Sequence, residues 1–160
     1  MTSVEHARDS HPTNPRPAFA QPRLILYVFL GGGIGVGFRL GIELLLPWSA
    51  EDGIPWAIVT TNLSGAFILG FLLTALGRRG PETSARRDIR LFAGTGILGG
   101  FTTYSSFATD TAVLLGTSPV LAAGFGMVGV LAGVVAAALG VSLAGALVRE
   151  PSTQTEEDAA

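Results

Sequence analysis

The 160-residue sequence contains no cysteine and no lysine. Without cysteine it has no disulfide framework, no thiol nucleophile and no cysteine-based metal site. Without lysine it cannot form a Schiff base, and it lacks the Gly-Lys-Ser/Thr end of the P-loop that binds nucleotide phosphates. These two absences exclude several classes of enzyme.

Charge is also scarce. Only 14% of the residues are charged, compared with about 25% in an ordinary soluble domain. Hydrophobic residues make up 48% of the chain, and the mean hydropathy is +0.50. The formal net charge of −2 provides no basic surface for nucleic acid, so we expect no such partner. The composition predicts an integral membrane protein whose surroundings are the lipid bilayer.

The two ends of the chain are polar. Residues 1–22 hold four prolines among polar and charged residues, without the apolar core of a signal peptide. Residues 150–160 form an acidic tail that includes Glu156, Glu157 and Asp158. We expect both ends to be disordered, which leaves residues 23–149 as the membrane domain.

Four apolar segments divide this domain. Each is long enough to cross a hydrocarbon core of about 30 Å as a helix. The predicted spans are residues 24–46, 54–76, 91–115 and 119–148. The expected fold is therefore an all-α membrane protein with four transmembrane helices.

The third span contains the segment GTGILGGFTTYSSFATD at residues 94–110. In lipid every backbone polar group needs an internal partner, and a helix is most easily lost where Gly99 and Gly100 precede Thr102 and Thr103. We therefore expect a broken third helix. Freed carbonyls and hydroxyls at that depth indicate an ion or substrate site. A glycine-rich packing seam, with hydroxyls bonded to the preceding turn, is the alternative.

The first span is rich in glycine. Residues 31–41 fail the Gly-x-Gly-x-x-Gly pattern of nucleotide-binding loops but contain pairs of glycines four residues apart, which let helices approach closely. These pairs are Gly31/Gly35, Gly33/Gly37 and Gly37/Gly41. Close helix packing is the better interpretation.

Two polar features lie within the first two spans. Arg39 and Glu43 share one helical face, so either they form a structural ion pair near the membrane edge or the arginine attracts an ion. Asn62 lies in the middle of an uncharged span, where an unpaired amide is costly. It therefore needs either a hydrogen-bond partner on another helix or a ligand, and both interpretations remain open.

These elements together resemble a known family. The run GGFTTYSSF at residues 99–107, the glycine-rich first span ending in Arg39, and NLSGAFILG at residues 62–70 resemble the CrcB/Fluc fluoride channels. The resemblance covers roughly residues 24–148. It implies a fluoride-selective channel that lowers cytoplasmic fluoride by passive export, built as an antiparallel, pseudo-two-fold dimer, and it implies no enzymatic activity.

The resemblance also assigns residue roles. It implies that the fluoride pore is lined by Asn62, Thr103, Tyr104, Ser106 and Phe107. Arg39 would face the entrance vestibule. The backbone carbonyls of Gly99 and Thr102 would hold a structural sodium ion, Na+, at the dimer centre. The family usually has phenylalanine where this chain has Tyr104, and this departure leaves the conduction rate open.

Two other functions compete with a channel. A small four-helix proton-coupled multidrug or metabolite exporter would need a titratable carboxylate within a span. Glu43 and Asp110 are the only candidates, and both are expected near span ends. A non-conducting assembly subunit would need only glycine seams and polar residues that hold helices together. The broken third span and Asn62 argue against that second rival.

The arginines predict the orientation in the membrane. The loops at residues 47–53 and 116–118 contain none, so the positive-inside rule places both termini in the cytoplasm. The resemblance implies that the membrane is the inner membrane of a bacterium. The arginines on the cytoplasmic side are Arg8, Arg16, Arg23, Arg78, Arg79, Arg86, Arg87, Arg90 and Arg149. An antiparallel homodimer would require insertion in both directions. We therefore expect a heterodimer with a related four-helix subunit of reversed charge bias, with a homodimer as the alternative.

Overall fold

The computed structural model describes residues 21–49 and 53–149, which contain helices and loops and no strand. The elements are α1 (Pro22–Leu45), α2 (Trp56–Gly77), α3 (Ser84–Ile89), the π-helical segment η3 (Arg90–Leu98), α4 (Gly99–Phe101), α5 (Tyr104–Thr117) and α6 (Pro119–Leu147). The expected all-α fold is confirmed for this part of the chain. Both predicted tails lie almost entirely outside it.

Three of the helices, α1, α2 and α6, are long and apolar enough to cross a membrane. Their bounds differ from the predicted spans by at most two residues at either end. Few of their side chains are buried inside the chain, and large apolar side chains such as Phe29, Leu45 and Val120 are exposed. Such extensive apolar exposure indicates a membrane protein.

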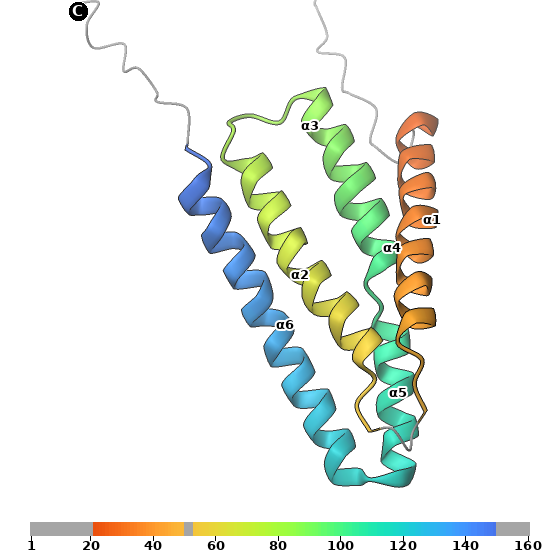
Figure 1. The fold of residues 1–160 in the computed structure, drawn as a ribbon. Coiled ribbons are helices and arrows are strands. Elements are labelled where there is room, and N and C mark those ends of the chain that lie inside the picture. The colour runs from red at the N-terminus through yellow and green to blue at the C-terminus, as the bar shows by residue number, and fades with distance from the viewer. Residues whose placement is uncertain (1–20, 50–52, 150–160) are drawn as a thin grey trace, which may run out of the picture.

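The third apolar segment is not one helix. The segments α3, η3, α4 and α5 follow one another between the same two ends of the molecule as the long helices (Figure 1). Helical structure begins at Ser84, before the predicted start at residue 91, and ends at Thr117. The sequence patterns did not predict the π-helical turns of η3.

The helix break lies at the threonines. Thr102 (φ −79°, ψ 153°) and Thr103 (φ −147°, ψ 119°) are extended, whereas Gly99 keeps helical angles (φ −65°, ψ −33°) and Gly100 lies within α4. The predicted break in the third segment is confirmed, and within the predicted stretch it falls on the threonines and not on the glycine pair. β-branched threonines favour extended backbone, whereas the glycines serve helix packing.

Glycines bring α1 against η3 and α4. A Cβ atom on Gly31 would overlap the carbonyl oxygen of Phe92, and one on Gly35 would overlap that of Ile97. The predicted close approach at Gly31/Gly35 is confirmed. A Cβ atom on Gly33, Gly37 or Gly41 would meet nothing within 4 Å among the described residues, so the prediction for those pairs is wrong within the chain.

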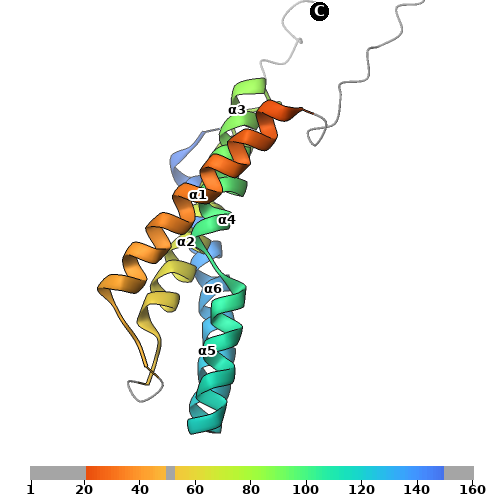
Figure 2. The same ribbon diagram turned by 90° about the vertical axis from the view of Figure 1, so that its right-hand side faces the viewer.

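A second close approach joins α2 to α6. A Cβ atom on Gly70 would lie 2.5 Å from the carbonyl oxygen of Ala137, and one on Gly140 would overlap that of Phe67. The helix α5 packs against the first half of α6. Figure 2 shows the C-terminal end of α1 leaning away from α5, so these two helices separate toward that end.

Arginines gather at one end of the molecule. The start of α1, the connection between α2 and α3, and the end of α6 lie together at that end (Figure 1). Arg23 pairs there with Asp88 at 3.1 Å, and Arg90 pairs with Glu82 at 2.8 Å. The described arginines other than Arg39 belong to these segments, to α3 or to the first residue of η3, whereas Arg8 and Arg16 lie outside the described residues.

We expect Gly35→Ala to destabilise the single chain in detergent by about 1–3 kcal/mol, because the new methyl group must displace backbone of η3. Gly37→Ala is the matched control, since its methyl group meets open space, and alanine favours the helix by up to about 1 kcal/mol. Thermal unfolding followed by circular dichroism measures both variants. Equal stability of the two would contradict the packing seen at Gly35.

Candidate functional site

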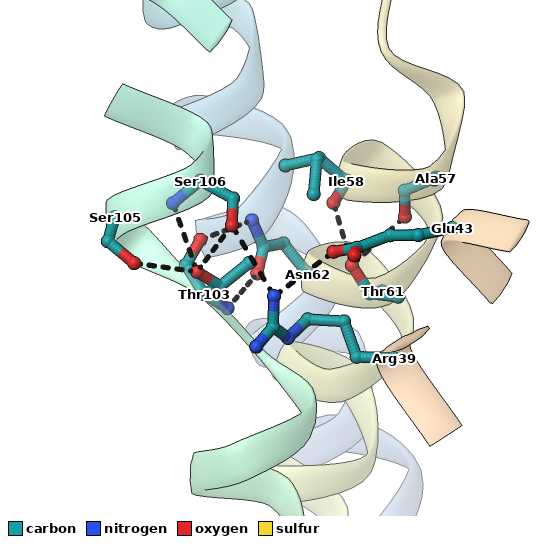
Figure 3. Close-up of polar contacts among 9 residues, drawn as sticks. All are labelled: Arg39, Glu43, Ala57, Ile58, Thr61, Asn62, Thr103, Ser105 and Ser106. Carbon is teal, nitrogen blue, oxygen red and sulfur yellow. Dashed lines mark hydrogen bonds and ion pairs between the residues drawn. The ribbon is translucent and has the colours of Figure 1, made fainter. Parts of the chain in front are cut away.

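The helix break is tied to α2 by the side chain of Asn62. Its Nδ2 atom donates to the carbonyl oxygen of Thr103 at 3.0 Å, and its Oδ1 atom accepts from the Thr103 backbone N–H at 2.8 Å (Figure 3). The carboxamide thus pairs with both backbone groups of one extended residue, as a neighbouring strand would. The predicted need of Asn62 for a partner is met by this inter-helix pair.

Two backbone carbonyl oxygens at the break lack the donors that a continuous helix would supply. In a continuous helix the N–H of Thr103 would bond to the carbonyl of Gly99, but here it bonds to Asn62. Likewise the N–H of Ser106 bonds to the Thr103 side chain and leaves the carbonyl of Thr102 without that donor. No hydrogen bond from the described residues reaches either carbonyl. Both remain available to an external cation.

Three hydroxyl groups lie together where α5 begins. The Oγ1 atom of Thr103 accepts from the backbone N–H of Ser106 at 3.1 Å and thereby caps the helix. The same atom donates to the Oγ atom of Ser106 at 3.1 Å and lies 3.1 Å from the Oγ atom of Ser105. Thr103 is buried, so this cap is protected from solvent.

Arg39 extends this cluster to α1. Its Nη1 atom donates to the Oε1 atom of Glu43 at 3.0 Å and to the Oγ atom of Ser106 at 3.4 Å (Figure 3). The Nε atom of Arg39 is buried and has no partner among the described residues. The structural ion pair suggested by the spacing is confirmed, and one polar network now joins α1, α2 and α5.

The two aromatic residues of the motif differ in their surroundings. Tyr104 is 82% exposed. The ring of Phe107 packs against that of Phe125, with centroids 4.9 Å apart and planes inclined by 38°. Gly129 makes room for it, because a Cβ atom there would lie 2.8 Å from the Cε2 atom of Phe107.

These aromatic side chains line a groove of about 880 Å³ between α2, α5 and α6. The lining is almost entirely apolar, with Asn62 and Thr103 among its few polar members. The groove therefore combines ring edges with the amide and hydroxyl of the break. Sequence reasoning missed Phe125, which belongs to the uncharged last helix and carries no recognisable motif.

Comparison with known proteins identifies the family. A family model described as "CrcB-like protein, Camphor Resistance (CrcB)" matches residues 26–141. The chain belongs to the CrcB family. This match covers α2, most of α1 and α6, the break and every residue named above as part of the polar network.

Individual relatives of this CrcB chain have informative names. The "Fluoride-specific ion channel FluC" of Mesorhizobium japonicum is 36% identical over 124 residues, 77% of this chain and 97% of that protein. The one from Thermus thermophilus is 38% identical over 126 residues, 77% of this chain and 96% of that protein. "Fluoride-specific ion channel FluC 2" of Leifsonia xyli is 46% identical over 104 residues, 65% of this chain and 70% of that protein.

The predicted site residues of the CrcB chain fall into three groups. The polar network contains Arg39, Asn62, Thr103 and Ser106. The groove contains Tyr104 and Phe107, with Asn62 and Thr103 belonging to both groups. Gly99 and Thr102 present their carbonyls at the break. The roles of these residues toward fluoride and sodium stay predictions.

We expect Asn62→Leu to destabilise the protein by about 2–5 kcal/mol, because both backbone groups of Thr103 lose a partner away from water. Ser64→Ala is the matched control on the same helix, since Ser64 donates only to carbonyls of the preceding turn. Thermal unfolding in lipid nanodiscs compares the two. A Leu variant as stable as the Ala variant would show that Asn62 does not hold the break.

Proposed function

We propose that this chain is a fluoride-selective ion channel that lowers cytoplasmic fluoride by passive export. The observation that carries the proposal is a cluster of neutral hydrogen-bond donors at a helix break in a membrane protein of the CrcB family. The relatives named as fluoride-specific channels support the choice of ion. An ion channel is not an enzyme, and no catalytic residue is assigned.

The chemistry of the cluster suits fluoride. The ion is small and strongly hydrated, so a pore must replace water with fixed N–H, O–H and positive ring edges. The amide of Asn62 carries two N–H donors and uses one on Thr103, which leaves the other for the ion. Ser106 and the ring edges of Tyr104 and Phe107 supply the remaining contacts, and Thr103, whose hydroxyl donates to Ser106, lines the pore beside them. Such neutral groups bind an anion weakly enough for it to leave.

In this proposal four segments cross the bilayer. The three long helices and the broken segment from Ser84 to Thr117 run between the same two ends (Figure 1). The end that carries the arginines faces the cytoplasm, which places both termini there and the chain in the bacterial inner membrane.

A structural Na+ held by the carbonyls of Gly99 and Thr102 forms part of the proposal. Carbonyl oxygens are ligands that hard cations prefer, and these two accept no hydrogen bond from the described residues. One chain thus offers two oxygens, so a two-fold-related partner would complete a set of four. The residues present fit the ion, whose positive charge would hold the two breaks together.

The partner in this proposal is a related four-helix subunit, inserted in the opposite direction. The apolar groove beside Tyr104 and Phe107 is open in the single chain, which supports a covering subunit. The arginine-rich end of this chain favours one orientation only. A copy of the same chain could insert antiparallel only against that bias, so a subunit with reversed charge is favoured over a homodimer.

The proton-coupled exporter is the weaker candidate. Its two possible carboxylates are Glu43, which is paired with Arg39, and Asp110. Reconstituted protein should release fluoride but not chloride from liposomes, without a proton gradient. Uptake of a dye that depends on a proton gradient would instead favour the exporter.

We expect Phe107→Ile to lower fluoride flux about tenfold, since losing about 1.4 kcal/mol from a ring–anion contact is a factor of ten. Tyr104→Phe keeps the ring and should leave the rate within about threefold or raise it. Phe125→Ile is the control for packing, because it removes the neighbour of Phe107 and keeps the ring itself. Fluoride-electrode assays on liposomes measure all three. Normal flux in the Phe107→Ile variant, with loss of flux in the Tyr104→Phe variant, would show that fluoride contacts the hydroxyl group of Tyr104 and not the ring edge of Phe107.

We expect reporter fusions at residue 160 to read cytoplasmic only, because every described arginine except Arg39 lies in segments at one end. The chain expressed alone should then conduct poorly, and co-expression with a homologous subunit of opposite bias should restore flux. A mixed reporter signal, or full flux from the purified single chain, would overturn the heterodimer and leave the channel assignment intact.

A further inference from the structure

The hydroxyl cluster beside the break contains donors whose direction is fixed. The guanidinium of Arg39 has N–H donors and no acceptor, and it points one of them at the Oγ atom of Ser106. The backbone N–H of Ser106 likewise can only donate, and it points at the Oγ1 atom of Thr103. Each of these groups occupies one lone pair of the hydroxyl that it contacts, and the hydroxyl of Thr103 donates to that of Ser106.

Counting hydrogens and lone pairs then assigns a donor or acceptor role in each contact to the three hydroxyl groups of the cluster. A hydroxyl has one hydrogen and two lone pairs. The Oγ atom of Ser106 accepts from Arg39 and from the hydroxyl of Thr103, so both its lone pairs are occupied. The hydrogen of Thr103 is used on Ser106, so at the 3.1 Å contact with Ser105 the hydroxyl of Ser105 is the donor. The hydrogen of Ser106 is the one left without an acceptor.

We propose that Arg39 is a positioning residue that makes the Ser106 hydroxyl an obligatory donor to fluoride. The inference rests on the proposed function and adds a mechanism for selectivity. Without Arg39, one lone pair of Ser106 is open, so the hydroxyl can also accept a hydrogen bond or contact a cation. A hydroxyl with its lone pairs occupied favours an anion and disfavours cations and water molecules that need an acceptor.

Glu43 keeps this arrangement compatible with conduction. Its carboxylate lies 3.0 Å from the Nη1 atom of Arg39, and both side chains are largely shielded, with 22% and 30% exposed. The pair offsets the positive charge of the guanidinium. A full positive charge beside the pore would bind fluoride too tightly for rapid exit, whereas a paired one directs hydrogen bonds without trapping the ion.

A double-mutant cycle between Arg39→Met and Ser106→Ala tests the proposal, in whichever assembly conducts. The readouts are the fluoride concentration at half-maximal flux and the fluoride-to-chloride flux ratio. Each single variant should lower the flux ratio about tenfold, the size expected for one hydrogen bond to an ion. Arg39→Met should then cause no further loss in the Ser106→Ala background, and Arg39→Lys should retain part of the selectivity because an ammonium also only donates.

One control variant and three possible outcomes make the experiment decisive. Arg23→Met removes an arginine from the ion pair with Asp88 at the other end of the molecule and should leave selectivity unchanged. Multiplicative losses in the cycle, shrinking as ionic strength rises, would overturn the proposal in favour of long-range attraction by Arg39. Coupling that appears in the unfolding temperature but not in the flux ratio would also overturn it. Absence of fluoride flux from the unsubstituted protein would instead reject the proposed function.

Discussion

The pairing of Asn62 with the backbone of Thr103 is the interaction on which the rest of the site depends. A chain that leaves its helix inside a membrane exposes polar backbone groups, and each one costs several kcal/mol in lipid without a partner. One carboxamide satisfies both groups of Thr103. Because the acceptor for the Thr103 N–H comes from α2 and not from the preceding turn, the carbonyl of Gly99 accepts no hydrogen bond from the described residues, so the bond that stabilises the break also leaves an oxygen open.

Close helix packing keeps this break in place. Gly31 and Gly35 let α1 lie directly against the backbone of η3, and Gly100 lies against α1 just before the break. Shielding by neighbouring backbone lowers the local dielectric, which strengthens hydrogen bonds made there. The π-helical turns of η3 fall within the same contact, a site where irregular helix is often found next to function.

The sequence predicts those parts of the fold that depend on local pattern. Apolar length predicted the three long helices, and the mixture of glycine and threonine predicted a break within the third segment. Its position at Thr102–Thr103 depends on Asn62, which lies 41 residues before Thr103 in the chain, and so it could not follow from local propensity. Phe125 was missed for a similar reason: its part in the groove depends on how α6 lies against α5, and an apolar residue in an apolar helix carries no mark of that contact.

The residues of the site have different structural roles. Asn62 holds the backbone and offers a donor, and Thr103 caps α5 and orients the hydroxyl of Ser106, so a substitution at either one changes stability and chemistry together. Tyr104 and Phe107 lie on the first turn of α5 and make none of the hydrogen bonds that secure the break. Tyr104 is 82% exposed, so a tyrosine is tolerated there without loss of the fold, whereas the ring of Phe107 packs against Phe125. Variation between related channels is therefore expected at the position of Tyr104, while the amide and the capping threonine stay constrained by the backbone they satisfy.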